Sequence, residues 1–198
     1  MTKIVLASGS VARREILRSA GLDFDVVPAD IDEDSVKHIM RLEGCSALET
    51  AQALADLKAG EVSKVHTRAM VIGADQMLEC NGSWFNKPRS LDGARSQLME
   101  LRGQKHELSS SITAAQCGKV VFRHGVTSGL TMRSFSESFL DSYLQLESQN
   151  VCKSVGGYRI EGNGIQLFSS VTGSYFDILG LPLLPLLTFL RTEAILGD

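Results

Sequence analysis

Residues 6–17 read LASGSVARREIL, and this stretch predicts how the fold begins. The apolar letters at its start close a run over 3–7 of the kind that forms a buried strand. Two serines and a glycine then break the run, and Ser10 is a residue type that caps helix N-termini. The helix is expected to continue to about Ala20, where Gly21 supplies a stop. The stretch therefore predicts a buried strand, a tight turn and a helix in direct succession.

The turn at residues 8–10 also has the features of a phosphate-binding site. A helix N-terminus presents unpaired N–H groups and a partial positive charge, which attract anions. Ser8 adds a hydroxyl donor, Gly9 lets a ligand approach the backbone, and Arg13 brings a positive charge within one turn. The alternative is an ordinary capped turn with surface arginines, since neither the P-loop pattern nor the dinucleotide-binding glycine pattern is present. From the residues alone, both interpretations stand.

The rest of the chain alternates strands and helices and then turns to hairpins. AMVIGAD at 69–75 is the clearest buried strand, and Asn81-Gly82 just after it is typical of a hairpin turn. Two strand-like runs around Gly118 predict a second hairpin. We therefore expect an α/β fold with a mixed, twisted sheet flanked by helices. The other expectations are a strand at 24–30, helices at 34–43, 47–62, 90–104, 136–146 and 182–196, glycine-rich loops over 155–180, and core positions at Ile16 and Leu17.

Composition and charge indicate a globular intracellular protein. Hydrophobic residues make up 43% of the 198 and charged residues 22%, which is ordinary for one substantial domain with a core. The formal net charge of −3 argues against broad nucleic-acid binding, which normally needs a basic surface. The N-terminus lacks a signal-peptide pattern, and the longest apolar run, 178–190, is too short to cross a bilayer. We therefore expect a cytoplasmic protein without a nucleic-acid or membrane partner.

Three charged positions are candidates for chemistry. Asp75 ends the buried strand at 69–75, where α/β proteins place ligands, so it could hold a metal or deprotonate a water. Lys87 precedes a proline, which fixes the chain and could aim its ammonium group. Glu33, in the acidic run at 30–34, could join Asp75 at a divalent cation, because carboxylates suit Mg²⁺. The ordinary alternatives are a solvated strand-end carboxylate, a surface lysine and an acidic helix start.

Taken in order, several short motifs resemble one protein family. LASGSVARREIL is followed by FDVVPADIDE, LADLKA, VIGADQ, NKP and GLPLLPLL, and their order and spacing are similar to those of the Maf family of nucleoside triphosphate pyrophosphatases. The resemblance runs from about residue 3 to 191. It implies an elongated, two-lobed fold related to the inosine triphosphate pyrophosphatases, with residues 1–198 forming one domain around a central nucleotide cleft. It also implies hydrolysis of a nucleoside triphosphate to the monophosphate and pyrophosphate, Mg²⁺ or Mn²⁺ as cofactor, and a homodimer as a family-level expectation.

The same resemblance assigns roles to individual positions. Asp75 matches the proton acceptor that activates water, and Ser8 and Arg13 match phosphate contacts from the first loop. The positions expected to line the polyphosphate and metal site are Glu33, Lys58 and Lys87, with Glu33 and Asp75 as the metal ligands. This set is chemically sensible, because cations and helix N–H groups offset charge on phosphate oxygens while a carboxylate positions the nucleophile.

Three further positions bear on the base of the nucleotide. Gln76 in GADQ and Glu161 in GYRIEG resemble the branch of the family that acts on 7-methyl-GTP, since a carboxylate can accept hydrogen bonds from the N1–H and exocyclic amine of guanine. Ala12 departs from both branches, which have an arginine or a tryptophan there, and it cannot stack on a base. The resemblance therefore implies a 7-methyl-GTP pyrophosphatase, with a dTTP and UTP pyrophosphatase as an alternative. A weakly catalytic nucleotide-binding regulator of cell division or septum formation is the other alternative.

Overall fold

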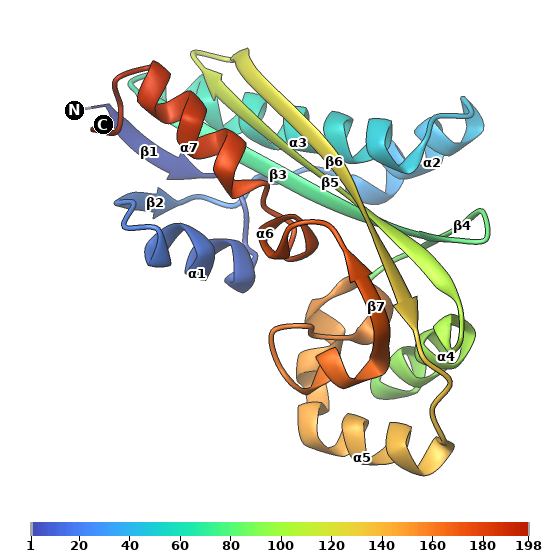
Figure 1. The fold of residues 1–198 in the computed structure, drawn as a ribbon. Helices are drawn as coiled ribbons and strands as arrows, with labels where there is room; N and C mark the ends of the chain where they lie inside the picture. Colours follow the sequence, from blue (N-terminus) through green and yellow to red (C-terminus); the bar gives the residue numbers. More distant parts are fainter. Residues whose placement is uncertain (1, 198) are drawn as a thin grey trace. The chain divides into compact units, whose positions relative to one another are not determined.

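The computed structural model describes residues 2–197, which form an α/β fold (Figure 1). The strands are β1 (Lys3–Leu6), β2 (Phe24–Val26), β3 (Ala69–Cys80), β4 (Ser83–Phe85), β5 (Lys105–Gln116), β6 (Lys119–Met132) and β7 (Phe168–Thr172). The α-helices are α1 (Val11–Ser19), α2 (Glu33–Leu42), α3 (Ala47–Val65), α4 (Leu91–Leu101), α5 (Glu137–Glu147), α6 (Tyr175–Ile178) and α7 (Leu183–Thr192). Three 3₁₀ turns are η1 (Ser148–Lys153), η2 (Val155–Gly157) and η3 (Asn163–Leu167).

The strands form one mixed sheet, as the sequence predicts. Its order is β2-β1-β3-β5-β6-β7, and β4 pairs with β3. The pairs β1–β2 and β1–β3 are parallel, whereas β3–β4 and β6–β7 are antiparallel. A parallel pair needs a crossover connection, and α1 and α3 lie in the segments that supply it.

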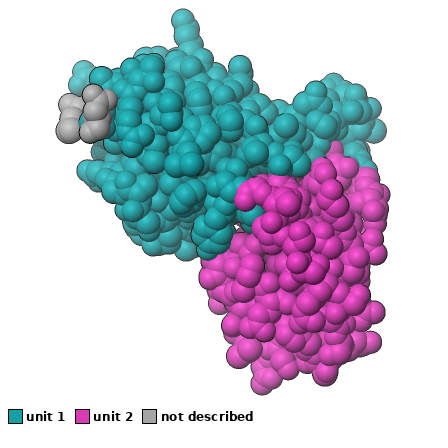
Figure 2. Space-filling model, in the orientation of Figure 1, with its two compact units in different colours: residues 1–76, 109–127, 174–198 teal, residues 77–108, 128–173 magenta. Residues whose placement is uncertain are grey.

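The chain divides into two compact units, coloured separately in Figure 2. Unit 1 comprises residues 1–76, 109–127 and 174–198, and unit 2 comprises residues 77–108 and 128–173. The boundary falls within the long strands β3, β5 and β6, so each of these strands contributes residues to both units.

In unit 1, alternate residues of the parallel strands face opposite layers of helices. Ile4 and Leu6 of β1 pack with Met70 and Ile72 of β3 in one apolar cluster, which also takes in Leu17 of α1 and three leucines of α7. The residues between them in sequence belong to a second cluster, which comprises Val5, Ala7, Val62, Ala69 and Val71. This two-residue alternation is that of a strand buried on both faces. It confirms the expected helices on both sides of the sheet.

The predicted local signals form where they were expected. Ser10 caps α1, its Oγ accepting from the backbone N–H of Arg13 at 3.4 Å. Asn81 and Gly82 both have positive φ, 49° and 76°, and close the β3–β4 hairpin with Cys80 paired to Ser83. Positive φ at both central residues is the type I′ geometry that matches strand twist, which is why Asn-Gly is favoured there. The predicted core positions in α1 are also confirmed, since Ile16 and Leu17 are buried.

Residues 155–180 differ most from the sequence expectation. Residues 155–180 are not loops throughout: they include two 3₁₀ turns, strand β7 and the short helix α6. Strand β7 pairs antiparallel with β6, with Leu130 opposite Val171. Its letters, FSSVT, carry little apolar signal because most of the strand is exposed, so the pairing partner defines it.

Two smaller differences concern the residues at which a strand and a helix end. Strand β2 stops at Val26, earlier than the expected 24–30, and the last helix ends at Thr192. Ala194 follows with φ 53°, which a continuing helix does not allow.

All four cysteines are free thiols. Within residues 2–197, no helix combines the length and apolar character needed to cross a bilayer.

Candidate active site

Most of the expected site residues lie in unit 1. That unit contains Ser8, Ala12, Arg13, Glu33, Lys58, Asp75 and Gln76, whereas Lys87 and Glu161 belong to unit 2. Each group is described within its own unit.

A buried ammonium group joins two carboxylates in unit 1. Lys58 Nζ, on α3, lies 2.6 Å from Asp75 Oδ1 on β3 and 2.7 Å from Glu33 Oε1 at the start of α2. The side chains of Lys58 and Asp75 are only 9% and 7% exposed, while that of Glu33 is 41% exposed. A charge-assisted hydrogen bond this short, with little water around it, is stronger than a surface ion pair. The structure thus brings together three of the residues expected around the polyphosphate.

The two carboxylate oxygens of Asp75 differ in their hydrogen bonding. Oδ1 accepts from Lys58, whereas the buried Oδ2 has no hydrogen-bond partner within the described part of the chain. Leaving a buried polar atom unpaired costs about 1–3 kcal/mol, so such an atom commonly has a chemical role. A carboxylate oxygen in this state can accept a proton from a water or ligate a cation.

The position of Asp75 in the strand differs from the sequence expectation. Strand β3 continues to Cys80, so Asp75 lies inside the strand and not at its end. The parallel neighbour β1 stops earlier, with Leu6 opposite Ile72 as the last pair. Asp75 therefore lies three residues beyond the point where β1 ceases to cover β3, a place where α/β sheets expose side chains to ligands.

Ser8 and Arg13 meet at the N-terminus of α1, as expected. Arg13 Nη1 donates to Ser8 Oγ at 3.1 Å, and Ser8 Oγ also accepts from the backbone N–H of Ser10. The guanidinium is buried, and it further donates to the carbonyl oxygens of Ala74, at 2.7 Å, and Gly180, at 2.8 Å. Burial lowers the pKa of Arg13, and the charges of Asp75 and Glu33 oppose this shift. Arg13 thus joins the first turn to β3 and to the turn before α7.

Gln76 is fixed by polar groups that sequence reasoning did not identify. Its Nε2 donates to Ser110 Oγ at 2.9 Å and to the carbonyl oxygen of Ile178 at 2.9 Å, with a longer bond to that of Asp177. Ser110 Oγ itself donates to the carbonyl oxygen of Asp177 at 2.7 Å. The fully buried serine in β5 was the available signal, because a buried hydroxyl needs a partner. Two carbonyl acceptors leave the Gln76 amide only one orientation.

The two expected residues of unit 2 lie in different settings. Lys87 is exposed, between the buried residues Phe85 and Pro88. Glu161 Oε1 lies 3.1 Å from Arg159 Nε, and Arg159 also pairs with the buried Glu147 at 3.2 Å. Glu161 is therefore held by a cation of its own unit, which the sequence reading did not foresee.

Metal binding by side chains alone has little support in the geometry. Among residues 2–197, no group of three or more histidine, cysteine, aspartate or glutamate side chains is placed to hold a metal ion. Two carboxylates, Glu33 and Asp75, share Lys58. This donor set fits a cation such as Mg²⁺, which is commonly bound by one or two carboxylates together with substrate phosphates.

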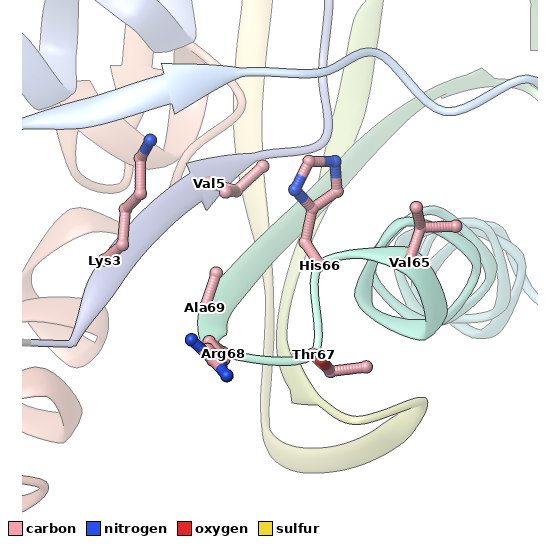
Figure 3. Close-up of a pocket in the computed structure, with 7 residues that line it drawn as sticks. All are labelled: Lys3, Val5, Val65, His66, Thr67, Arg68 and Ala69. Atoms are coloured by element: carbon pink, nitrogen blue, oxygen red, sulfur yellow. The ribbon is translucent and has the colours of Figure 1, made fainter.

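A surface hollow elsewhere in unit 1 is distinct from these residues. It has a volume of about 260 Å³ and is lined by Lys3, Val5, Val65, His66, Thr67, Arg68 and Ala69 (Figure 3). The hollow lies where α3 ends and β1 and β3 begin, and it contains none of the predicted site residues. Its cation Lys3 is already paired with Asp25 at 2.5 Å. We therefore assign the hollow no part in the candidate site.

Known proteins give an independent view of the chain. Residues 3–193 match the Maf family, described as Maf-like protein. A relative from Granulibacter bethesdensis, named nucleoside triphosphate pyrophosphatase, is 51% identical over 96% of both chains. A relative from Mesorhizobium japonicum, named 7-methyl-GTP pyrophosphatase, is 45% identical over 96% of both chains. The solved structure of the Staphylococcus aureus Ham1 protein overlaps 66% of this chain and 71% of its own at 18% identity and a TM-score of 0.44, which is too weak to bear on function. The family match and the two relatives, each covering nearly the whole chain, show that the chain belongs to the Maf family.

Proposed function

We propose that this chain hydrolyses nucleoside triphosphates to the monophosphate and pyrophosphate. The observation that carries the proposal is the state of Asp75: one oxygen is held by the buried Lys58, and the other is buried and has no hydrogen-bond partner among residues 2–197. A base positioned in this way is what an anhydride hydrolase needs to activate water. The names of the relatives from Granulibacter bethesdensis and Mesorhizobium japonicum agree with this reaction.

The reaction requires one bond to form, one bond to break and one proton to be taken up by a base. The oxygen of water forms a bond to phosphorus at the α–β anhydride, the bond to the bridging oxygen breaks, and pyrophosphate leaves. One proton of the water passes to Asp75 Oδ2, and it later returns to solvent. Lys58, bonded to Oδ1, fixes the carboxylate and leaves Oδ2 as the accepting atom. Transfer to a positioned base typically contributes about 10²- to 10⁴-fold in rate.

The phosphates would be held from the first turn of α1. The Ser8 hydroxyl and the Arg13 guanidinium lie together there, so negative charge would be met by donors already in place. We assign Lys87 to the same polyphosphate on the basis of its match to the NKP motif alone. Preorganised donors of this kind stabilise charge that develops on phosphate oxygens during transfer.

We assign a divalent cation, Mg²⁺ or Mn²⁺, to Glu33 and Asp75. When bound, the cation supplies charge neutralisation on the phosphate oxygens. Glu33 is the more exposed ligand and Asp75 the more buried, so a triphosphate could supply further oxygen ligands from the solvent side.

For the base, we propose 7-methylguanine. The Gln76 amide N–H₂ is committed to carbonyl and hydroxyl oxygens, so the side chain has only its Oε1 acceptor to offer a ligand. Glu161 is also an acceptor. Acceptor side chains suit a base that presents neighbouring N–H donors, which guanine has and a pyrimidine lacks. The relative named for 7-methyl-GTP supports this choice, and Ala12, which leaves no aromatic platform for stacking, predicts modest base affinity.

A substrate panel tests the proposal. The protein is incubated with Mg²⁺ or Mn²⁺ and with 7-methyl-GTP, GTP, dTTP, UTP and ATP, and the initial rates and products are measured for each. We expect the fastest turnover with 7-methyl-GTP. Faster turnover of dTTP or UTP would reject the base assignment in favour of a pyrimidine pyrophosphatase. Tight binding without turnover of any nucleotide would reject hydrolysis and favour a nucleotide-binding regulator.

A further inference from the structure

Strand β3 presents a row of alternate residues to helix α3. Residues 69 and 71 of β3 pack with Val62 of α3, and four residues after position 71 Asp75 bonds Lys58 of the same helix. Successive odd positions of a strand lie on one face, so Gly73 points at α3 from between these contacts. The strand and the helix therefore meet at Gly73 immediately before the Lys58–Asp75 pair.

At Gly73 the backbones of β3 and α3 approach too closely for a side chain to fit. A Cβ atom there would lie 2.4 Å from the carbonyl oxygen of Ala55, 2.7 Å from the backbone nitrogen of Ala59 and 3.0 Å from Ala59 Cβ. The first two are backbone atoms of a long helix, which cannot rotate aside as a flexible side chain would. Gly73 is absent from the glycines with positive φ, so space and not backbone conformation requires glycine here.

We infer that Gly73 is a positioning residue for the Lys58–Asp75 pair. Its missing side chain lets α3 lie against β3, and this separation brings Lys58 Nζ to 2.6 Å from Asp75 Oδ1. Any side chain at position 73 must move the helix outward by several tenths of an ångström or more. Lys58 moves with the helix, and its ammonium group then no longer fixes the carboxylate. This inference rests on the proposed role of Asp75 as proton acceptor.

The test compares two glycine-to-alanine changes, one at the contact of β3 with α3 and one elsewhere on α3. Gly73→Ala inserts a methyl group between helix and strand, whereas Gly60→Ala adds the same methyl group to α3 at a point where no described residue packs within 4 Å of it from outside the helix's own backbone. Both variants are measured for kcat, KM and the dissociation constant of a non-hydrolysable triphosphate analogue. For Gly73→Ala we expect kcat to fall about 10- to 100-fold, because a shift near 1 Å can cost that much in rate. We expect KM and analogue binding to change less than threefold, and Gly60→Ala to match the unmodified protein.

Several outcomes decide the matter. If the Gly73→Ala protein is folded and its kcat is within threefold of the unmodified value, the inference is overturned. It is also overturned if kcat falls but a crystal structure of the variant shows an unchanged Lys58–Asp75 distance. If Gly73→Ala is recovered unfolded, Ala59→Val replaces it, because that change widens the same contact from the helix side, and unchanged kcat in it overturns the inference equally. Asp75→Asn is measured in parallel. Full activity in Asp75→Asn refutes the proposed function itself, whereas loss in Asp75→Asn without loss in Gly73→Ala refutes only the role of Gly73.

Discussion

Each unit contains a cation between two carboxylates, and the two clusters are built alike. In unit 1, Lys58 lies between the buried Asp75 and the more exposed Glu33. In unit 2, Arg159 lies between the buried Glu147, with 6% of its side chain exposed, and Glu161, with 28% exposed. They differ in the buried carboxylate. Both oxygens of Glu147 have partners, Arg159 and the backbone N–H of Asn163, whereas Oδ2 of Asp75 has no hydrogen-bond partner in the described part of the chain.

This difference separates a structural ion pair from a candidate reacting group. Both carboxylate oxygens of Glu147 accept hydrogen bonds, and they join α5 to the segment around 159–163. The hydroxyl of Tyr143 in α5 also accepts from the backbone N–H of Arg159. Removing a group of this kind should cost stability. Asp75 carries the energetic cost of an unpaired buried oxygen, and removing it should cost chemistry.

The largest expected effect comes from Asp75→Asn. The change keeps the size of the side chain and removes its ability to take a proton, so turnover should fall about 10²- to 10⁴-fold. Nucleotide binding, followed by titration calorimetry, should persist because the donors at Ser8 and Arg13 are untouched. Retained turnover in this variant would contradict the role of Asp75.

The second effect concerns His106, a buried histidine in unit 2. Burial lowers the pKa of His106 to about 4 from the usual 6.5, and one ring nitrogen contacts the hydroxyl of Tyr158 at 2.9 Å. Because the unfolded chain binds this proton more readily, protonation of His106 favours unfolding. The free energy of unfolding is therefore at its full value above pH 6.5, and His106 lowers it by about 3 kcal/mol as the pH drops to 4. Urea unfolding between pH 7.5 and 4 measures the loss.

Carboxylates titrate in the same range, so His106→Gln serves as the control and should show a flatter pH dependence. An equal slope in both proteins would contradict the assignment.

The third effect tests the structural cluster directly. Glu147→Ala leaves Arg159 with Glu161 alone and removes the acceptor for the Asn163 N–H, so the free energy of unfolding should fall by about 2 kcal/mol. At a temperature where the variant is fully folded, kcat should stay within a few-fold of the unmodified value. A large loss of kcat with unchanged stability would reverse the contrast between the two clusters.

The smallest effect concerns substrate preference. Glu161→Gln keeps the shape of the side chain and gives it a donor in place of one acceptor oxygen. We expect the ratio of kcat/KM for 7-methyl-GTP over dTTP to fall about tenfold, which corresponds to about 1.4 kcal/mol. If the ratio is unchanged, Glu161 acts only as a partner of Arg159.

Much of the fold could be predicted because its signals are local. The Ser10 cap depends on residues within one helical turn, and the Asn81-Gly82 turn on two adjacent backbone angles. The alternation in strands β1 and β3 follows from their apolar letters alone. Strand β7 could not be predicted in this way, because its exposed residues form a strand only through pairing with β6.

The candidate site was predicted by residue type more than by environment. Lys58 and Asp75 were identified by their motifs, yet their contact depends on the packing of α3 on β3. Arg13 was expected to face phosphate, but its partners Ala74 and Gly180 are 61 and 167 residues away in sequence, and no local pattern indicates them. Gly73, a glycine inside a buried strand, was a visible signal of close backbone approach.

The most direct test of the central claim is ³¹P NMR of the products formed from 7-methyl-GTP and Mg²⁺ by the unmodified protein and by Asp75→Asn. The account predicts equal amounts of 7-methyl-GMP and pyrophosphate from the unmodified protein, and unreacted triphosphate from the variant over the same time. Orthophosphate as the first product, or pyrophosphate released by Asp75→Asn at the unmodified rate, would contradict it.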